Sequence, residues 1–278
     1  MTKLELLDSG YGLLEGPRYN DGKLFFSDVT KGGVYCLNGN GRTELVVPKR
    51  RGVGGIALHE DGGLVITGRN VCHVKDGVTT ILLDEDGVGG FNDLFTDSEG
   101  RVLVGSLRSD PFGRDQNVPG ELYRIGLDGK ATVLYEKVHI TNGIGFSPDS
   151  TRVYHSDSGP KTVIAHDVTK NGELKNRKVF ATLKKGLPDG LAVDELGCVW
   201  VANYDGGGID RFTPEGELDF TLDIPSSAVT SLCFGGLERR DLFIVTADNT
   251  ENPDLEGSIF QTKVETPGLA VAYARVPV

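Results

Sequence analysis

The sequence has few cationic residues for its length, and it contains no long apolar run. It carries 29 Lys and Arg residues against 40 Asp and Glu residues, so the formal net charge of the 278 residues is −11. Binding to nucleic acid or to an anionic membrane relies on clustered Lys and Arg, and we therefore expect neither partner. No apolar stretch approaches the roughly 18 residues that a membrane-spanning helix requires. The composition argues against a transmembrane protein.

Cysteine is also sparse, and its spacing matches no metal-binding or redox pattern. The four cysteines are Cys36, Cys72, Cys198 and Cys233, and they form neither a CxxC pair nor a Cys/His cluster. Each lies in or beside an apolar run, so we expect four buried, unpaired thiols in a reducing compartment. Residues 1–8 carry acids where a secretory signal peptide needs an apolar core, which predicts a cytoplasmic location.

Glycine, by contrast, is abundant, and its excess indicates many tight turns. The 39 glycines are about twice the share of an average protein. A short segment also recurs along the chain, beginning with a polar or small residue, continuing with apolar ones and ending at a polar turn. The six copies begin at Glu15, Gly54, Asn92, Asn142, Asp189 and Thr230. Their starts lie 38 to 50 residues apart, which is the period of β-propeller blades.

Each copy is followed by further short apolar segments separated by turns, and no segment has a sustained helical period. This pattern predicts a single six-bladed β-propeller domain over residues 1–278, all-β, with four antiparallel strands in each blade. We expect N- and C-terminal strands to close the ring, with residues 4–7 and 269–273 pairing in one blade. A β-sandwich is the alternative, but it would not explain six repeats in register.

The innermost strand of each blade lines the propeller axis, so the first residues of the six copies should converge at one end of the channel. Two acids and two amides would meet there without a counter-charge, which is costly. A divalent cation resolves this, because Glu15 and Asp189 balance its charge while Asn142 and Asn92 add carbonyl oxygens. Such a donor set suits Ca²⁺ best, with Mg²⁺, Mn²⁺ or Zn²⁺ as alternatives. The Gly54 side of the ring should leave room for water and substrate.

A different interpretation is that Asp189–Gly190 and Asn142–Gly143 are ordinary turn dipeptides and that Glu15 is a surface acid. Their shared register argues against it, and so does a resemblance that covers the chain from about residue 11 onward. The sequence resembles the SMP-30/gluconolactonase/luciferin-regenerating-enzyme family in its segments Glu15–Pro17, Phe91–Asp93, Asn142–Ile144, Ser156–Ser158, Pro188–Asp194, Val199–Ala202 and Cys233–Gly236. This resemblance implies a six-bladed propeller with a divalent metal at its axis, and an activity on lactones or, in some members, on organophosphates.

By that resemblance, Glu15, Asn142 and Asp189 are metal ligands, Asn92 is a fourth site residue, and Asp189 is the catalytic acid and base. His139, three residues before Asn142, is a second candidate base, although packing is its more ordinary role. We therefore expect a divalent-metal-dependent lactonase acting on a small-molecule lactone, as a monomer or small homo-oligomer. A phosphotriesterase on the same metal site, and a non-catalytic metal-binding scaffold, are the alternatives.

The sequence departs from the family in the third blade. Members acting on sugar lactones commonly carry Arg two residues before the Asn of that blade, where this chain has Gly90. We therefore expect less hydroxylated substrates than gluconolactone. A longer loop over residues 106–120 is either a substrate lid or a solvated loop, and Arg108 and Asp110 are its candidate substrate-binding residues. The loop also carries Pro111, Phe112, Arg114, Asp115 and Gln116.

Overall fold

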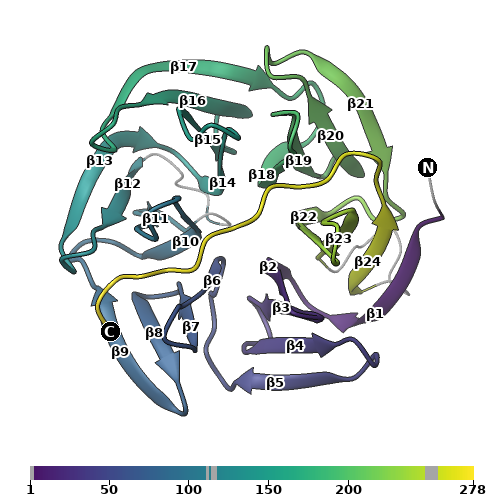
Figure 1. Ribbon diagram of the computed structural model, residues 1–278, viewed down its shortest axis with the longest axis horizontal. Helices are drawn as coiled ribbons and strands as arrows, with labels where there is room; N and C mark the ends of the chain where they lie inside the picture. The colour runs from purple at the N-terminus through teal and green to yellow at the C-terminus, as the bar shows by residue number, and fades with distance from the viewer. Residues whose placement is uncertain (1–2, 111–112, 114–117, 248–255) are drawn as a thin grey trace.

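The computed structural model describes residues 3–110, 113, 118–247 and 256–278. Its strands form six antiparallel sheets of four strands, arranged around a common axis as the blades of a propeller (Figure 1). No helix is present in the described part of the chain, and none there is long and apolar enough to cross a membrane. The predicted fold class and number of blades are confirmed.

Five blades are built from consecutive strands. Blade 1 holds β2 (Leu14–Asn20), β3 (Lys23–Asp28), β4 (Val34–Asn38) and β5 (Thr43–Val47); blade 2 holds β6 (Ile56–Leu58), β7 (Leu64–Ile66), β8 (Val71–Lys75) and β9 (Val78–Leu83). Blade 3 holds β10 (Gly90–Thr96), β11 (Val102–Leu107), β12 (Gly120–Ile125) and β13 (Ala131–Val138). Blade 4 holds β14 (Thr141–Phe146), β15 (Arg152–Asp157), β16 (Thr162–Val168) and β17 (Leu174–Thr182); blade 5 holds β18 (Leu187–Val193), β19 (Val199–Tyr204), β20 (Gly208–Phe212) and β21 (Leu218–Asp223).

Blade 6 joins the two ends of the chain. It consists of β22 (Val229–Gly235), β23 (Asp241–Thr246), β24 (Gly257–Lys263) and, as its outermost strand, β1 (Glu5–Tyr11). The pairing of β1 with β24 places Glu5 opposite Gln261 and Leu6 opposite Phe260. An N-terminal and a C-terminal strand therefore close the ring, as predicted.

The C-terminal partner in this closure differs from the expected one. Residues 269–273 do not pair in blade 6, because β1 already completes its four strands. They belong instead to a segment, residues 268–276, that crosses the disc from blade 5 to blade 2 and that we call the C-terminal strap (Figure 1). Its backbone is held by inner strands, since Leu269 N donates to Val193 O at 3.0 Å and Ala274 N to Leu58 O at 2.7 Å.

Burial follows the distance of a strand from the axis. The inner strands are almost wholly buried, whereas outer strands such as β13 and β17 expose most of their side chains. The apolar clusters lie between neighbouring blades; one of them joins blades 2 and 3 and includes Ala274 and Val276 of the strap. All four cysteines are buried and free, as expected. Packing between blades thus holds the ring, and the inner strands are its most constrained part.

We predict that removing residues 2–8 destabilises the ring. The deletion strips the part of β1 that pairs with the end of β24, and it exposes an open sheet edge. The expected loss is about 5–10 °C in Tm, since about 2–4 °C accompany each kcal/mol in a protein of this size. Deleting the exposed residues 277–278 is the control and should leave Tm unchanged. An unaltered Tm in the first variant would contradict the closure.

Candidate functional site

A local irregularity occurs at the same place in most inner strands. The register between the first two strands of a blade shifts at the ring residue or directly after it, between Glu15 and Arg18 in blade 1 and between Phe91 and Leu94 in blade 3. The same shift follows Thr141 in blade 4 and Pro188 in blade 5. Such bulges redirect side chains and are common beside functional sites. Here each one lies at the position predicted to face the axis.

The structure brings the predicted polar residues into one cavity of about 580 Å³ at one end of the channel. Its lining includes the residues predicted to bind metal or substrate: Glu15, Asn92, Arg108, Asp110, Asn142 and Asp189. Half of the remaining lining residues are apolar or aromatic, namely Leu13, Val29, Phe91, Leu107, Ile140, Leu187 and Tyr204; the others are four glycines with Arg69, Ser109 and Ser158. Thr230, the sixth ring residue, instead donates to the carbonyl oxygens of Leu14 and Val245 and has a structural role.

A chain of hydrogen bonds sets the orientation of the two carboxamides. The Ser158 hydroxyl donates to Pro188 O at 2.6 Å, so its oxygen is free to accept from Asn142 Nδ2 at 2.7 Å. Asn142 Oδ1 therefore points toward Asn92, whose Nδ2 donates to it at 2.6 Å and also to Thr141 O at 2.8 Å. One lone pair of Asn142 Oδ1 is taken by Asn92 Nδ2, and the second is left for a cation at this edge of the cavity.

The expected open space beside Gly54 does not exist. A Cβ atom at Gly54 would lie 2.1 Å from Asn92 Oδ1, so the carboxamide of Asn92 fills the position that a side chain would occupy. The glycine is needed because blades 2 and 3 approach closely at this level of the ring. Water and substrate must therefore enter from the open end of the cavity.

The two carboxylates of the site are buried, and the charge of Arg18, which lowers the pKa of Glu15, offsets only part of the cost. Glu15 and Asp189 are 7% and 6% exposed. Burial raises the pKa of both well above the usual range, the charge of Asp189 raises the pKa of Glu15 further, and the charge of Asp93 adds to both effects. Asp189 Oδ1 is buried and has no hydrogen-bond partner among the described residues. A cation placed between the carboxylates would remove each of these costs, so the residues present fit a metal site.

The donor set of such a site is mixed. In the described parts of the chain, no three His, Cys, Asp or Glu side chains are grouped so that they could hold a metal ion. A cation would depend on the two carboxylates together with the carbonyl oxygen of Asn142. All-oxygen ligation of this kind is typical of Ca²⁺ and Mg²⁺ and is unusual for Zn²⁺.

Gly90 and residues 107–110, at the end of β11 and the start of the loop after it, form one side of the cavity. A Cβ at Gly90 would lie 3.0 Å from Gly68 O, so the backbone of blade 2 occupies the space that a larger residue would need. Arg108 Nε donates to Glu121 at 2.7 Å, which holds this guanidinium against the wall. The loop residues Pro111, Phe112, Arg114, Asp115 and Gln116 lie outside the described residues.

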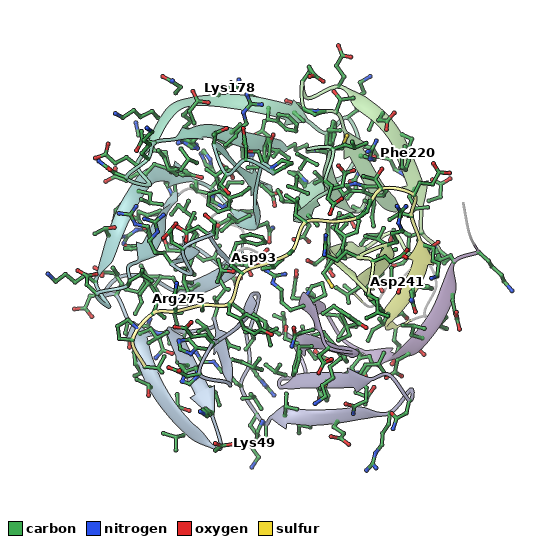
Figure 2. All side chains as sticks on the ribbon, in the orientation of Figure 1. Lys49, Asp93, Lys178, Phe220, Asp241 and Arg275 are labelled. Carbon is green, nitrogen blue, oxygen red and sulfur yellow. The ribbon has the colours of Figure 1, made fainter. Side chains whose placement is uncertain are left out.

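Two residues contribute to the site in roles that the sequence did not predict. Ser158, which orients Asn142, follows strand β15 and lies in the family-like segment Ser156–Ser158, but its sequence context indicated no role in the site. Asp93 lies next to Asn92 near the centre of the disc (Figure 2), and burial raises its pKa to about 6, although Arg18 lowers it. His139 does not line the cavity; its backbone N–H and ring nitrogen contact Asp157.

The family assignment follows from comparison with known proteins. Residues 13–248 match the SMP-30/Gluconolactonase/LRE-like region, and the chain belongs to this family. The chain is 30% identical over 262 residues to a 6-deoxy-6-sulfogluconolactonase of Pseudomonas putida, with 89% of each protein covered. It is also 30% identical over 290 residues to the pentonolactonase XacC of Haloferax volcanii, covering 100% of this chain and 95% of the relative.

The fold has close structural counterparts. A crystal structure of regucalcin from Agrobacterium tumefaciens, described as a calcium-binding protein, superposes with a TM-score of 0.88 at 22% identity. The match covers 99% of this chain and 98% of the regucalcin. At this level of identity the similarity supports the fold alone.

The buried carboxylates predict an unusual pH dependence of stability. A carboxyl group whose pKa is raised in the folded state holds its proton longer than in the unfolded chain, so stability falls as pH rises above about 4. In metal-free protein, Asp189→Asn removes the cost of burying the charged Asp189 carboxylate. It also removes the repulsion between this carboxylate and Glu15. We expect the variant to melt a few degrees above the wild type at pH 7, with the difference disappearing toward pH 4.

Thermal melts across this pH range test the expectation. Asp76→Asn, in an exposed turn, is the matched control and should change Tm at neither pH. A wild type that is more stable than Asp189→Asn at pH 7 without metal would contradict the electrostatic account of the site.

Proposed function

We propose that the protein is a divalent-metal-dependent lactonase whose cation is held by Glu15, Asn142 and Asp189 at the propeller axis. The observation that carries the proposal is the unpartnered, buried Asp189 Oδ1 beside a second buried carboxylate in an open cavity. Family membership and the lactonase names of the two relatives support the reaction type. We infer Ca²⁺ as the cation from the all-oxygen donors, in keeping with the calcium-binding regucalcin.

The chemistry requires polarisation of the lactone carbonyl and a proton carrier. A divalent cation bound here supplies Lewis-acid stabilisation of the negative charge that develops on the carbonyl oxygen. Asp189 accepts a proton from the water that attacks the carbonyl carbon, and the water oxygen forms the new C–O bond. The bond to the ring oxygen then breaks, and Asp189 returns the proton to the departing alkoxide. The product is an open-chain hydroxy acid.

The other residues hold this arrangement in place. Ser158 and Asn92 fix the carboxamide of Asn142, so that its carbonyl oxygen needs no rearrangement when the site is loaded. The inner strands that carry these side chains are buried between blades, which supplies the rigidity that positioning requires. Arg108 and Asp110, on the cavity wall, are the proposed contacts to the substrate.

The cavity wall favours lactones with few hydroxyl groups. The two relatives are named for sugar lactones, whose hydroxyls need polar partners. In this chain Gly90 offers no side chain, the neighbouring Arg69 is ion-paired with Asp84, and much of the rest of the wall is apolar. We infer that an apolar or sparsely hydroxylated lactone is the preferred substrate, and that the four free, buried thiols reflect a reducing cytoplasm.

Metal removal tests the proposed cofactor. Treatment with chelator should abolish hydrolysis, and Ca²⁺, Mg²⁺ or Mn²⁺ should restore it. The cation should also raise Tm, because it binds the assembled ring and not the unfolded chain. Full activity in metal-free protein would contradict the Lewis-acid role.

Asp189→Asn, assayed at saturating Ca²⁺, separates the two roles of Asp189. The variant keeps a carbonyl ligand but loses the base, and we expect kcat to fall by about 10²–10⁴. Asn142→Asp is the matched comparison, since it alters charge at the same ring while keeping Asp189, and it should retain turnover. If excess metal returns Asp189→Asn to near wild-type turnover, Asp189 is a ligand only and the base lies elsewhere.

A substrate panel tests specificity and the alternative functions. We expect kcat/KM for unsubstituted five- and six-membered lactones to exceed that for gluconolactone by about tenfold, a typical effect of unmatched polar groups in a pocket. A clear preference for gluconolactone would reverse this inference. Faster cleavage of a phosphotriester than of any lactone would favour the phosphotriesterase alternative. Absence of turnover with every substrate would favour the non-catalytic scaffold.

A further inference from the structure

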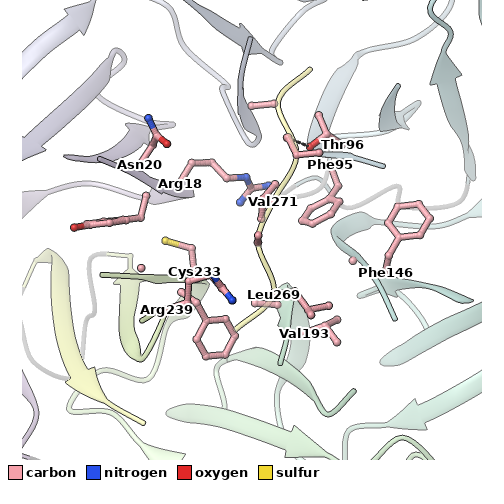
Figure 3. A pocket seen from close by; sticks show the side chains of 18 of the residues that line it. Arg18, Asn20, Phe95, Thr96, Phe146, Val193, Cys233, Arg239, Leu269 and Val271 are labelled. Atoms are coloured by element: carbon pink, nitrogen blue, oxygen red, sulfur yellow. Dashed lines mark hydrogen bonds between the residues drawn. The ribbon is translucent and has the colours of Figure 1, made fainter. Parts of the chain in front are cut away.

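A second cavity, of about 480 Å³, opens at the opposite end of the channel beneath the C-terminal strap (Figure 3). Among the described residues it shares no lining residue with the ring cavity. Much of its wall is apolar, and the residues that matter here are Arg18, Phe95, Phe146, Cys233, Phe234, Leu269 and Val271. The proposed lactonase site makes no use of this cavity.

The one deeply buried cation of this cavity is Arg18, whose guanidinium is incompletely paired. Arg18 is 9% exposed and lies over the ring of Phe95, with 5.6 Å from Cζ to the ring centroid. Its Nη1 and Nη2 each donate to a backbone carbonyl at 2.8 Å, but Nε has no partner among the described residues. Asp93 Oδ1 forms a buried ion pair with Nη2 at 3.7 Å, a distance too long for a hydrogen bond, so the charge of Arg18 is partly balanced while its hydrogen bonding stays incomplete. A buried guanidinium with an unused N–H donor binds carboxylates well.

The other arginine of the cavity, Arg239, is already neutralised. Its Nη2 donates to Glu195 at 2.6 Å and its Nε donates to Gly268 O at 2.8 Å. The cavity therefore offers the Arg18 guanidinium and a set of apolar side chains, together with polar residues that include Asn20, Thr96 and the exposed acid Asp21. An occupant must combine an anionic group with an apolar body, because a strongly polar molecule would leave its remaining groups unpaired against the wall.

We propose that this cavity is a binding site for a small carboxylate with an apolar body, with the carboxylate at Arg18 and the body between Phe146, Phe234 and the strap. The site lies at the opposite mouth of the channel from the proposed metal. It does not depend on the proposed lactonase function.

The single tryptophan provides a local reporter. Trp200 packs edge-on against Phe234, with 5.8 Å between ring centroids, and Phe234 lines the cavity. Titration of the intact protein with phenylpropanoate should therefore change tryptophan fluorescence in a saturable way. Phenylpropanamide, which has the same body without the charge, should give little response, and so should acetate, which lacks the apolar body.

Two variants of Val271 locate the site without disturbing the core. Val271 lies on the strap, lines the cavity near Arg18 (Figure 3) and is 46% exposed, so both variants should fold. Val271→Asp adds a repelling carboxylate and should weaken phenylpropanoate binding by about tenfold or more. Val271→Asn has the same shape without the charge and should bind as the wild type does.

Arg18→Lys keeps the charge but loses the planar fork, and it should also weaken binding. If this variant fails to fold, the Val271 pair still decides the question. Equal binding of the acid and the amide, or equal affinity in Val271→Asp and the wild type, would overturn the proposal.

Discussion

The pairing of β1 with β24 is the constraint on which the propeller depends. Without it, blade 6 has three strands, and nothing in the chain order ties its outer edge to blade 1. With it, the six inner strands are held at one radius and one level around the axis. A site made from single side chains of different blades requires the inner strands to be aligned at the same height along the axis. A shift of one residue in any inner strand would turn the site side chain of that strand away from the channel.

The ring concentrates charge where the fold can least solvate it. Glu15 and Asp189 are buried near one another, and Asp93 adds a third carboxylate nearby, with Arg18 as its partner at 3.7 Å. This arrangement lowers the stability of the metal-free protein, and it is the arrangement that would favour a cation. Rigid inner strands and the Ser158 hydrogen bonds keep the oxygens in place despite their mutual repulsion. Stability and site chemistry are therefore opposed at the axis, as is common in functional sites.

The two mouths of the channel have opposite character. One presents carboxylates and carboxamides, and the other presents a buried guanidinium between apolar walls under the strap. The difference arises within single inner strands: Glu15 and Arg18 are both on β2, three residues apart and on either side of its bulge. The same bulge that turns Glu15 toward one cavity thus leaves Arg18 facing the other.

The sequence by itself determined the number of blades, the antiparallel strands and the register of the ring, because each repeat carries its own turn and strand pattern within about 40 residues. The shared register of the repeats also predicted that Glu15, Asn92, Asn142 and Asp189 lie together at the propeller axis. Contacts between distant parts of the chain decided the rest. Asn92 fills the space at Gly54, Ser158 orients Asn142, and residues 269–273 cross the disc because β1 already occupies the edge of blade 6. Local patterns cannot encode such contacts, since they depend on which surfaces meet after the ring has closed.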